Sequence, residues 1–369
     1  MEFIVAILAI GVIIAFHELG HFAAAKACGV GVVEFALGMG PMLVHKRIGE
    51  TVYSLRAIPM GGFCAMYGEQ SVEADGAKGR DFKSDWEPSR SFDACPGWQR
   101  FVIALAGPAA NVLLAFLLLM TMAAVSGPKF GPVEVVELGP VAVAEEAGVR
   151  VGDILTRVDG RKIETSGSYS FYIDAHPRVL RDGYTLTVYR PSDGTTHDFF
   201  LVPDPEAELV GVTYKSQNQT GPFPFLDAGW RLLKTYATMS VDSVAMLLRG
   251  DAGLGDLSSM IGIATAMGDT IEEASDVQEA PEEESDRHAV ASAILSLAAM
   301  VSMGLAIMNM LPLPALDGGR ALITIGEGIA GRRLPRKVES MANGLCMLVL
   351  MLLMGVTMVM DLVRLLQSM

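Results

Sequence analysis

Four long apolar runs constrain what this chain can fold into. They lie at residues 3–28, 101–125, 289–311 and 338–360. Each is close to the ~20 residues that a helix needs to cross the hydrocarbon core of a bilayer. Across the 369 residues 51% are hydrophobic and only 19% are charged, which is typical of several membrane spans carrying a water-exposed module. The sequence therefore predicts a polytopic α-helical membrane protein with four transmembrane helices.

Basic residues indicate how these spans are oriented. The extreme N-terminus has no Lys or Arg, whereas the short connection between the third and fourth spans has five: Arg320, Arg332, Arg333, Arg336 and Lys337. Cytoplasmic loops are enriched in Lys and Arg. We therefore expect this connection in the cytoplasm, and both termini and residues 126–288 on the other side of the membrane.

The first apolar run contains two histidines and a glutamate, His17, Glu18 and His21. Residues four apart share one face of a helix, so both imidazoles can bind one metal ion while Glu18 lies beside it without being a ligand. Ionisable side chains at the centre of a membrane helix cost about 2.5–3.5 kcal/mol and usually mark function. The pattern predicts a zinc hydrolase site within the membrane rather than a structural histidine pair.

The third span ends in a second motif, Asn309-Met310-Leu311-Pro312-Leu313-Pro314-Ala315-Leu316-Asp317-Gly318-Gly319. Two prolines so close together break a helix, which is tolerated at membrane depth where the freed backbone lines a cavity enclosed by protein. Asp317 then places a carboxylate in apolar surroundings. A catalytic zinc site needs three protein ligands, and Asp317 supplies the donor type that the two histidines lack.

Residues 32–99 are rich in turn signals. Two short runs, 42–48 and 52–58, are joined by Gly49-Glu50 and predict a β-hairpin beside the membrane. Such a hairpin offers an edge strand to which an extended peptide can add, and an ordinary cytoplasmic loop is the alternative. The polar stretch 69–93 is expected to be flexible.

Residues 131–214 have the pattern of an independent α+β domain. Strands are expected at 133–138 and 184–190, with a short helix at 142–147 and a tight turn at Asp159-Gly160. The run Ala147-Gly148-Val149-x-x-Gly152-Asp153-Ile154-Leu155-x-x-Val158-Asp159-Gly160 resembles a PDZ domain. PDZ domains bind extended peptide tails by strand addition.

Two further segments separate this domain from the third span. Apolar residues recur every three or four positions across 226–248 and predict an amphipathic helix, which could lie flat in the membrane interface or pack on the domain. We favour the interface because Trp230 and Tyr236 suit that depth. The acidic segment 272–286 is expected to be a solvated, mobile loop.

Charge and cysteine content exclude other classes of protein. The net charge is −14 and no basic stripe is available to neutralise phosphates, so no nucleic acid partner is expected. Four scattered cysteines form no CxxC pair and are expected to be free thiols. The predicted organisation is 1–125 with two spans, the HExxH motif and the hairpin; 126–215, the PDZ domain; 216–288, the amphipathic helix and acidic loop; and 289–369 with the last two spans.

These motifs together resemble the site-2 protease type of intramembrane zinc metalloprotease, in particular bacterial members called regulator-of-sigma-E protease. The resemblance rests on His17-Glu18-x-x-His21, on Asn309-x-x-Pro312-x-x-x-Leu316-Asp317-Gly318 and on the PDZ-like segment. Two further landmarks are Gly38-Met39-Gly40-Pro41 and Gly107-Pro108-Ala109-Ala110-Asn111. Better-known relatives often have two PDZ domains, so this chain resembles the single-domain branch.

The resemblance implies a role for each site residue. His17, His21 and Asp317 would hold Zn²⁺, Glu18 would be the general base, and Asn309 would position the substrate or stabilise the developing oxyanion. The substrates would be single-pass transmembrane proteins in a bacterial inner membrane, such as anti-sigma factors or remnant signal peptides. The PDZ-like domain would lie on the extracytoplasmic side and screen out untrimmed substrates.

Two alternatives come from other classes of protein. In the first, the chain is a catalytically inactive PDZ membrane adaptor with a structural zinc ion, although such a site has no use for Glu18. In the second, it is a metal-ion transporter, which suits the histidine-bearing span but not the broken segment around Asp317.

Overall fold

The structure is a computed structural model that describes residues 2–69, 87–127, 130–138, 143–203, 212–217, 223–249 and 283–368. The chain forms two compact units. Unit 1 contains residues 1–115, 249–286 and 297–369, and unit 2 contains residues 116–248 and 287–296. Two long helices, α3 (Gly97–Ser126) and α9 (Glu283–Asn309), contribute residues to both units.

Three helices among the described residues are long and apolar enough to cross a membrane. They comprise residues 97–126, 290–309 and 337–360, so the second, third and fourth apolar runs all form helices of the expected kind. The first run also forms a helix, α1 (Glu2–Ala27). It is not among these three candidates, and its side chains before residue 9 lie outside the described part of the chain. A membrane protein with three candidate spans is therefore supported, and the fourth span stays a prediction.

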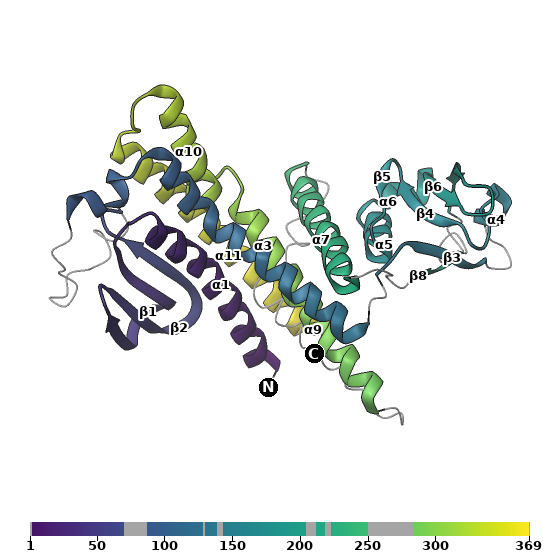
Figure 1. Ribbon diagram of the computed structural model, residues 1–369, viewed down its shortest axis with the longest axis horizontal. Helices are drawn as coiled ribbons and strands as arrows, with labels where there is room; N and C mark the ends of the chain where they lie inside the picture. The colour runs from purple at the N-terminus through teal and green to yellow at the C-terminus, as the bar shows by residue number, and fades with distance from the viewer. Residues whose placement is uncertain are drawn as a thin grey trace. The chain divides into compact units, whose positions relative to one another are not determined.

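The predicted hairpin is present in unit 1, beside α1 (Figure 1), and it is larger than expected. β1 (Val32–Ile48) and β2 (Thr51–Met66) pair antiparallel around Gly49, whose φ of 63° suits a residue without a side chain. Leu37 is in register with both Leu55 and Gly62. The first part of β1 therefore lies between two parts of β2, which a pattern of two short runs does not reveal.

The hairpin presents large apolar side chains on its surface: Met39, Met42, Leu43, Val44, Ile48, Leu55 and Ile58 are all exposed. Exposed apolar patches of this kind mark surfaces that contact a membrane or a partner. The hairpin is thus suited to the apolar surroundings predicted for it.

Small residues let α3 approach α1 closely. A Cβ atom at Gly20 would lie 2.3 Å from the backbone oxygen of Ala106, so only glycine fits there. Pro108 lies inside α3, two residues after Ala106. Small residues at such crossings are the usual means by which membrane helices pack, because they allow the backbones to touch.

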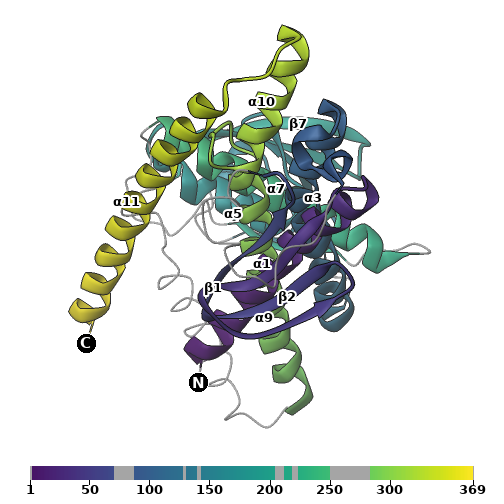
Figure 2. The ribbon, with the colours of Figure 1, turned by 90° about the vertical axis from the view of Figure 1, so that its left-hand side faces the viewer.

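The third apolar run ends as the prolines predict. α9 stops at Asn309, the chain turns through Pro312 and Pro314, and α10 (Asp317–Ala330) starts at once. α11 (Arg336–Ser368) follows and ends the described chain; Figure 2 shows it as one long helix leading to the C-terminus.

Unit 2 contains an α+β domain whose sheet has the strand order β7-β6-β4-β3-β8, with β5 paired to β4. The strands are β3 (Val133–Leu138), β4 (Ile154–Val158), β5 (Arg161–Lys162), β6 (Tyr184–Arg190), β7 (Thr195–Leu201) and β8 (Val212–Ser216). The helices are α4 (Val143–Ala147), α5 (Ser166–Ala175) and α6 (Pro177–Asp182). The predicted strands 133–138 and 184–190 are present with those bounds. The strands β7 and β8 and the helices α5 and α6 were not individually predicted.

The domain has its own apolar core. Val135, Leu186, Val188 and Leu201 have no exposed surface, and Tyr184 is 2% exposed. The hydroxyl groups of Tyr169 and Tyr184 hydrogen-bond each other at 2.6 Å, which satisfies both buried polar groups.

The predicted amphipathic helix forms as α7 (Pro224–Arg249) in unit 2. On one side Gly229 packs against Met120 of α3, where a Cβ atom would lie 2.7 Å from the Met120 Cγ. On the other side Lys234 contacts Glu164 of the α+β domain at 2.8 Å. The helix therefore packs on the domain, and its location in the membrane interface stays a prediction.

Two expectations about loops need correction. Glu69, expected in a flexible stretch, is buried and paired with Arg320 of α10, whereas residues 70–86 lie outside the described part of the chain. The acidic segment 272–286 lies outside it as far as residue 282, but residues 283–286 belong to α9 rather than to a loop. A run of acidic residues can begin a helix because negative charge is favourable at the helix N-terminus.

Candidate metal centre

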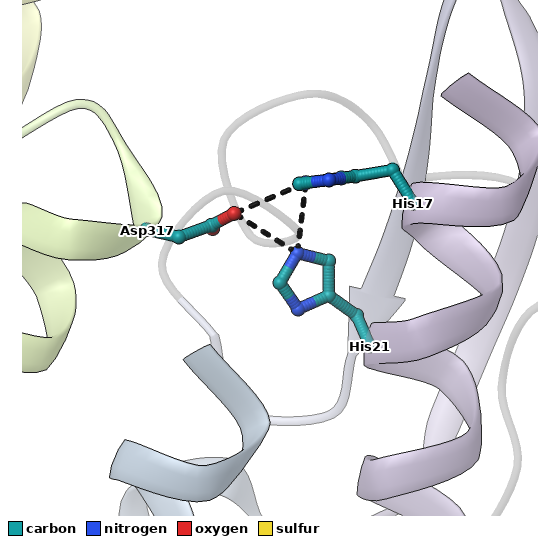
Figure 3. A group of neighbouring side chains, drawn as sticks. All are labelled: His17, His21 and Asp317. Atoms are coloured by element: carbon teal, nitrogen blue, oxygen red, sulfur yellow. Dashed lines mark hydrogen bonds and ion pairs between the residues drawn. The ribbon is translucent and has the colours of Figure 1, made fainter. Parts of the chain in front are cut away.

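His17 and His21 of α1 point towards one place (Figure 3). Both are buried, with 6% and 7% of their surface exposed, and their Nε2 atoms lie 3.2 Å apart. The spacing of four residues places both imidazoles on one face of the helix, as the sequence predicts.

Asp317, the first residue of α10, faces the two histidines from a second element (Figure 3). Its Oδ2 atom is 3.0 Å from Nε2 of His17 and 3.2 Å from Nε2 of His21. The turn before it is too tight for side chains at the next two positions. A Cβ at Gly318 would lie 2.2 Å from the backbone oxygen of Met310, and one at Gly319 would lie 2.0 Å from that of Leu313.

The donor atoms of this group fit zinc. Two imidazole nitrogens and a carboxylate oxygen are a common ligand set, and a tetrahedral ion with bonds of about 2.0–2.1 Å keeps its donors roughly 3.3 Å apart. The buried Oδ2 of Asp317 has no hydrogen-bond partner among the described residues. A buried carboxylate oxygen without a donor is costly, and a cation between the three atoms would remove that cost.

One face of α3 covers the histidines. Ile103, Gly107 and Asn111 are four residues apart on this helix. The backbone oxygen of Ile103 lies 2.8 Å from Nδ1 of His21. A Cβ at Gly107 would lie 2.2 Å from Nε2 of His21 and 2.7 Å from Nε2 of His17, so glycine leaves room for the donor atoms.

Asn111 makes the second contact with a histidine. Its Nδ2 atom is 3.2 Å from Nδ1 of His17, and the residue has no exposed surface. In the sequence, the run 107–111 is a landmark of the family resemblance to which no role was assigned. The spacing of four between Gly107 and Asn111 could have indicated that both face the same neighbour.

Glu18 is half-buried beside β2. A Cβ at Gly62 would lie 3.3 Å from the Glu18 Cγ, so the Glu18 side chain lies against this part of β2. The carboxylate does not belong to the His17–His21–Asp317 group. This position agrees with a carboxylate that lies next to a metal without binding it.

Asn309 is the last residue of α9 and is half-buried. It therefore adjoins the turn that delivers Asp317 to the histidines. Its predicted role towards a substrate stays a prediction.

Ion pairs hold α10 in place within unit 1. Arg100 of α3 contacts Glu327 of α10 at 2.8 Å, and both side chains are nearly buried. Arg320, one turn after Asp317, pairs with Glu69. These contacts fix the helix whose first residue completes the metal centre.

The site joins a buried histidine pair on one helix to an aspartate that follows a broken apolar helix. These features place the chain in the class of membrane proteins with a metallopeptidase type of site. The profile described as Peptidase family M50 matches residues 5–353 of this chain. The chain belongs to peptidase family M50, the site-2 protease family, which confirms the predicted family.

Named relatives agree with this assignment. A Clostridium perfringens protein named "Putative zinc metalloprotease CPE1693" is 30% identical over 98% of this chain and 99% of its own length. Zinc metalloprotease RasP of Geobacillus kaustophilus is 26% identical over 94% of both chains. Metalloprotease MmpA of Caulobacter vibrioides is 27% identical over 91% of this chain and 88% of its own. The protein is thus a membrane metalloprotease with zinc as its cofactor.

Proposed function

We propose that this metalloprotease hydrolyses peptide bonds within the transmembrane helices of single-pass membrane proteins, in regulated intramembrane proteolysis. The observation that carries the proposal is the convergence of His17 and His21 with Asp317, buried beside α3 and at the end of α9, two of the candidate spans. A hydrolytic centre in that position suits substrates that are themselves in the bilayer.

His17, His21 and Asp317 would hold the zinc ion, which supplies Lewis acidity and an activated water when bound. Glu18 takes the proton of the attacking water and passes it to the leaving amine. Asn309 donates a hydrogen bond to the developing oxyanion, a role that can contribute roughly 2.7–4 kcal/mol.

The hairpin of β1 and β2 would hold the substrate in an extended form. A helix hides its carbonyl groups in internal hydrogen bonds, so the scissile segment must unwind before attack. The part of β2 near Gly62 and Cys64 lies next to Glu18. A substrate strand added beside this part of β2 would bring its backbone to the general base.

The α+β domain would act as a PDZ-type filter. β8 is the last strand in the sheet order and contacts α5, as the hydrogen bond of 2.8 Å between Ser170 and Tyr214 illustrates. An edge strand beside a helix is the arrangement by which PDZ domains accept an extended peptide. In this proposal the domain rejects substrates whose outer portion has not been trimmed.

The proposed location is the inner membrane of a bacterial cell. The basic residues of the connection between α10 and α11 would lie in the cytoplasm, and the α+β domain would lie outside it. The substrates would be anti-sigma factors or remnant signal peptides. Membership of a metalloprotease family disfavours the adaptor and transporter alternatives.

The experiment uses the full-length protein in detergent or liposomes with a single-pass reporter. Glu18→Gln should retain zinc and lose cleavage, because an amide cannot accept the proton of the attacking water. Mass spectrometry of the products should place the cleavage within the apolar segment of the reporter. Cleavage outside that segment, or undiminished cleavage by Glu18→Gln, would contradict the proposal.

A further inference from the structure

The two histidines of the metal centre differ in what their second ring nitrogen contacts. Nδ1 of His21 lies 2.8 Å from the backbone oxygen of Ile103, which can only accept a hydrogen bond. Nδ1 of His17 lies 3.2 Å from the side-chain amide of Asn111, which can either donate or accept.

A histidine that binds a metal through Nε2 carries its proton on Nδ1. That proton needs an acceptor, which fixes the tautomer and the orientation of the ring. For His21 the Ile103 carbonyl is that acceptor. For His17, the group that faces Nδ1 is the side-chain amide of Asn111.

The orientation of the Asn111 amide decides whether it can accept. A half-turn of the amide exchanges Oδ1 and Nδ2 with almost no change in shape. With Nδ2 towards His17, Nδ1 must be the unprotonated nitrogen, the proton moves to Nε2, and Nε2 cannot bind a metal. The Oδ1 atom of Asn111 has no hydrogen-bond partner among the described residues, so no other contact holds it away.

We propose that Asn111 is a positioning residue for the metal centre, whose Oδ1 accepts a hydrogen bond from Nδ1–H of His17 and keeps Nε2 free for zinc. This inference rests on the proposed ligand set of His17, His21 and Asp317. In this arrangement the two histidines have equivalent hydrogen bonds, since each donates its Nδ1–H to an oxygen on the same face of α3.

The backbone around Asn111 is fixed independently of its side chain. The Ser302 hydroxyl of α9 donates to the backbone oxygen of Asn111 at 2.9 Å, and both residues have no exposed surface. Removing the Asn111 amide therefore leaves this contact between α3 and α9 in place. Removing the Ser302 hydroxyl breaks the contact and spares the His17 side chain, so it gives a matched control.

The test measures zinc affinity of the purified full-length protein by competition with a chelator of known affinity. Asn111→Leu keeps the volume but removes the acceptor, and it should bind zinc about 10–100-fold more weakly, as loss of such partners typically does. Asn111→Asp keeps an acceptor and should bind zinc as tightly as the unmodified protein or tighter. Ser302→Ala should bind zinc normally even where its thermal unfolding temperature falls.

A spectroscopic measurement covers the case in which the aspartate variant does not fold. Cobalt substituted for zinc reports ligand geometry in its visible bands. Asn111→Leu should change these bands because the His17 ring is no longer held, whereas Ser302→Ala should not change them.

Several results would overturn the inference. They are normal zinc affinity with an unchanged cobalt spectrum in Asn111→Leu, or a folded Asn111→Asp that binds zinc as weakly as Asn111→Leu. The variant His17→Ala distinguishes a failure of the role of Asn111 from a failure of the ligand assignment. If His17→Ala keeps full zinc content, the proposed ligand set fails; if it loses zinc while Asn111→Leu does not, only the role of Asn111 fails.

Discussion

At the scale of single residues, the metal centre depends on buried metal-ligating atoms, one of which, Oδ2 of Asp317, has no hydrogen-bond partner among the described residues. Asp317 is 9% exposed, and its Oδ2 faces two imidazole nitrogens rather than a hydrogen-bond donor from the backbone. Because the carboxylate is buried, its charge is unfavourable without a cation beside it. The same burial therefore favours binding of a cation.

Asp317→Asn should lower the zinc content of the purified protein, because a neutral amide is a weaker ligand than a carboxylate. Elemental analysis of the full-length protein measures zinc per chain. Asp227→Asn, on an exposed position of α7, is the matched control and should keep full zinc content. An unchanged zinc content in Asp317→Asn would mean that the third ligand lies elsewhere.

Gly107→Ala should reduce both zinc content and proteolysis, since the added methyl group would lie 2.2 Å from Nε2 of His21. Gly326→Ala is the matched control on α10, where an added Cβ meets nothing within 4 Å. Alanine is favoured over glycine in a helix by up to about 1 kcal/mol, so this control should be as stable as the unmodified protein or more so. Equal zinc content in the two variants would show that α3 can move away from the histidines.

At the scale of elements, close contacts and ion pairs decide which segments meet. The hairpin doubles back so that β2 reaches Glu18, and the pair of Arg100 with Glu327 holds α10 against α3. In the α+β domain the loop before β4 is held by Asp153, which accepts hydrogen bonds from Arg190 of β6 at 2.8 and 2.7 Å.

Burial by itself raises the pKa of Asp153. The hydrogen bonds from Arg190 and from the Arg150 backbone amide, together with the positive charge of Arg190, outweigh that effect, so the pKa in the folded domain lies below the usual range. The unfolded value is about 3.9. A lowered pKa contributes stability that is present above the unfolded value and is lost as the pH falls towards the folded value. Asp153→Asn should therefore destabilise the domain near neutral pH, with a penalty that shrinks below about pH 4.

Hydrogen exchange of the β4 and β6 amides in the full-length protein measures this effect across pH. Asp182→Asn is the control, because its pair with Arg181 is exposed on both sides and exposed pairs contribute only about 0–1 kcal/mol. A penalty for Asp153→Asn that does not depend on pH would mean that the charge of Asp153 is not what holds β4 to β6.

At the scale of the whole molecule, the proposed orientation in the membrane rests on where the basic residues lie. Arg332 and Arg333 lie in the short connection between α10 and α11, and Lys337 lies in the first turn of α11. The α+β domain follows the candidate span 97–126.

Protease added to the outside of spheroplasts should cut within residues 130–217 and leave the connection between α10 and α11 intact. The reverse should hold for inside-out vesicles. Mass spectrometry of the fragments identifies the cleaved segments, and cleavage of the connection after lysis is the control for its accessibility. Cutting of the connection in intact spheroplasts would invert the proposed orientation.

Much of this protein could be predicted from local sequence. The period of four between His17 and His21, the apolar length of the candidate spans and the prolines before Asp317 each act within one or two turns of chain. For that reason a pattern is sufficient to indicate two ligands on one helix face, a third after a helix break and an amphipathic helix at 226–248. The sequence by itself thus determined which residues could form a zinc site.

Tertiary structure alone decided which distant residues complete that site. Nothing local in the sequence indicates that the Ile103 carbonyl, Gly107 and Asn111 face the histidines, that Glu69 pairs with Arg320, or that β2 returns to Glu18. These contacts join residues more than forty positions apart, and their free energy depends on shape and on desolvated partners that exist only after the helices pack. The sequence therefore determines which chemical groups are present at the site, and the tertiary structure determines which hydrogen-bond partners those groups have.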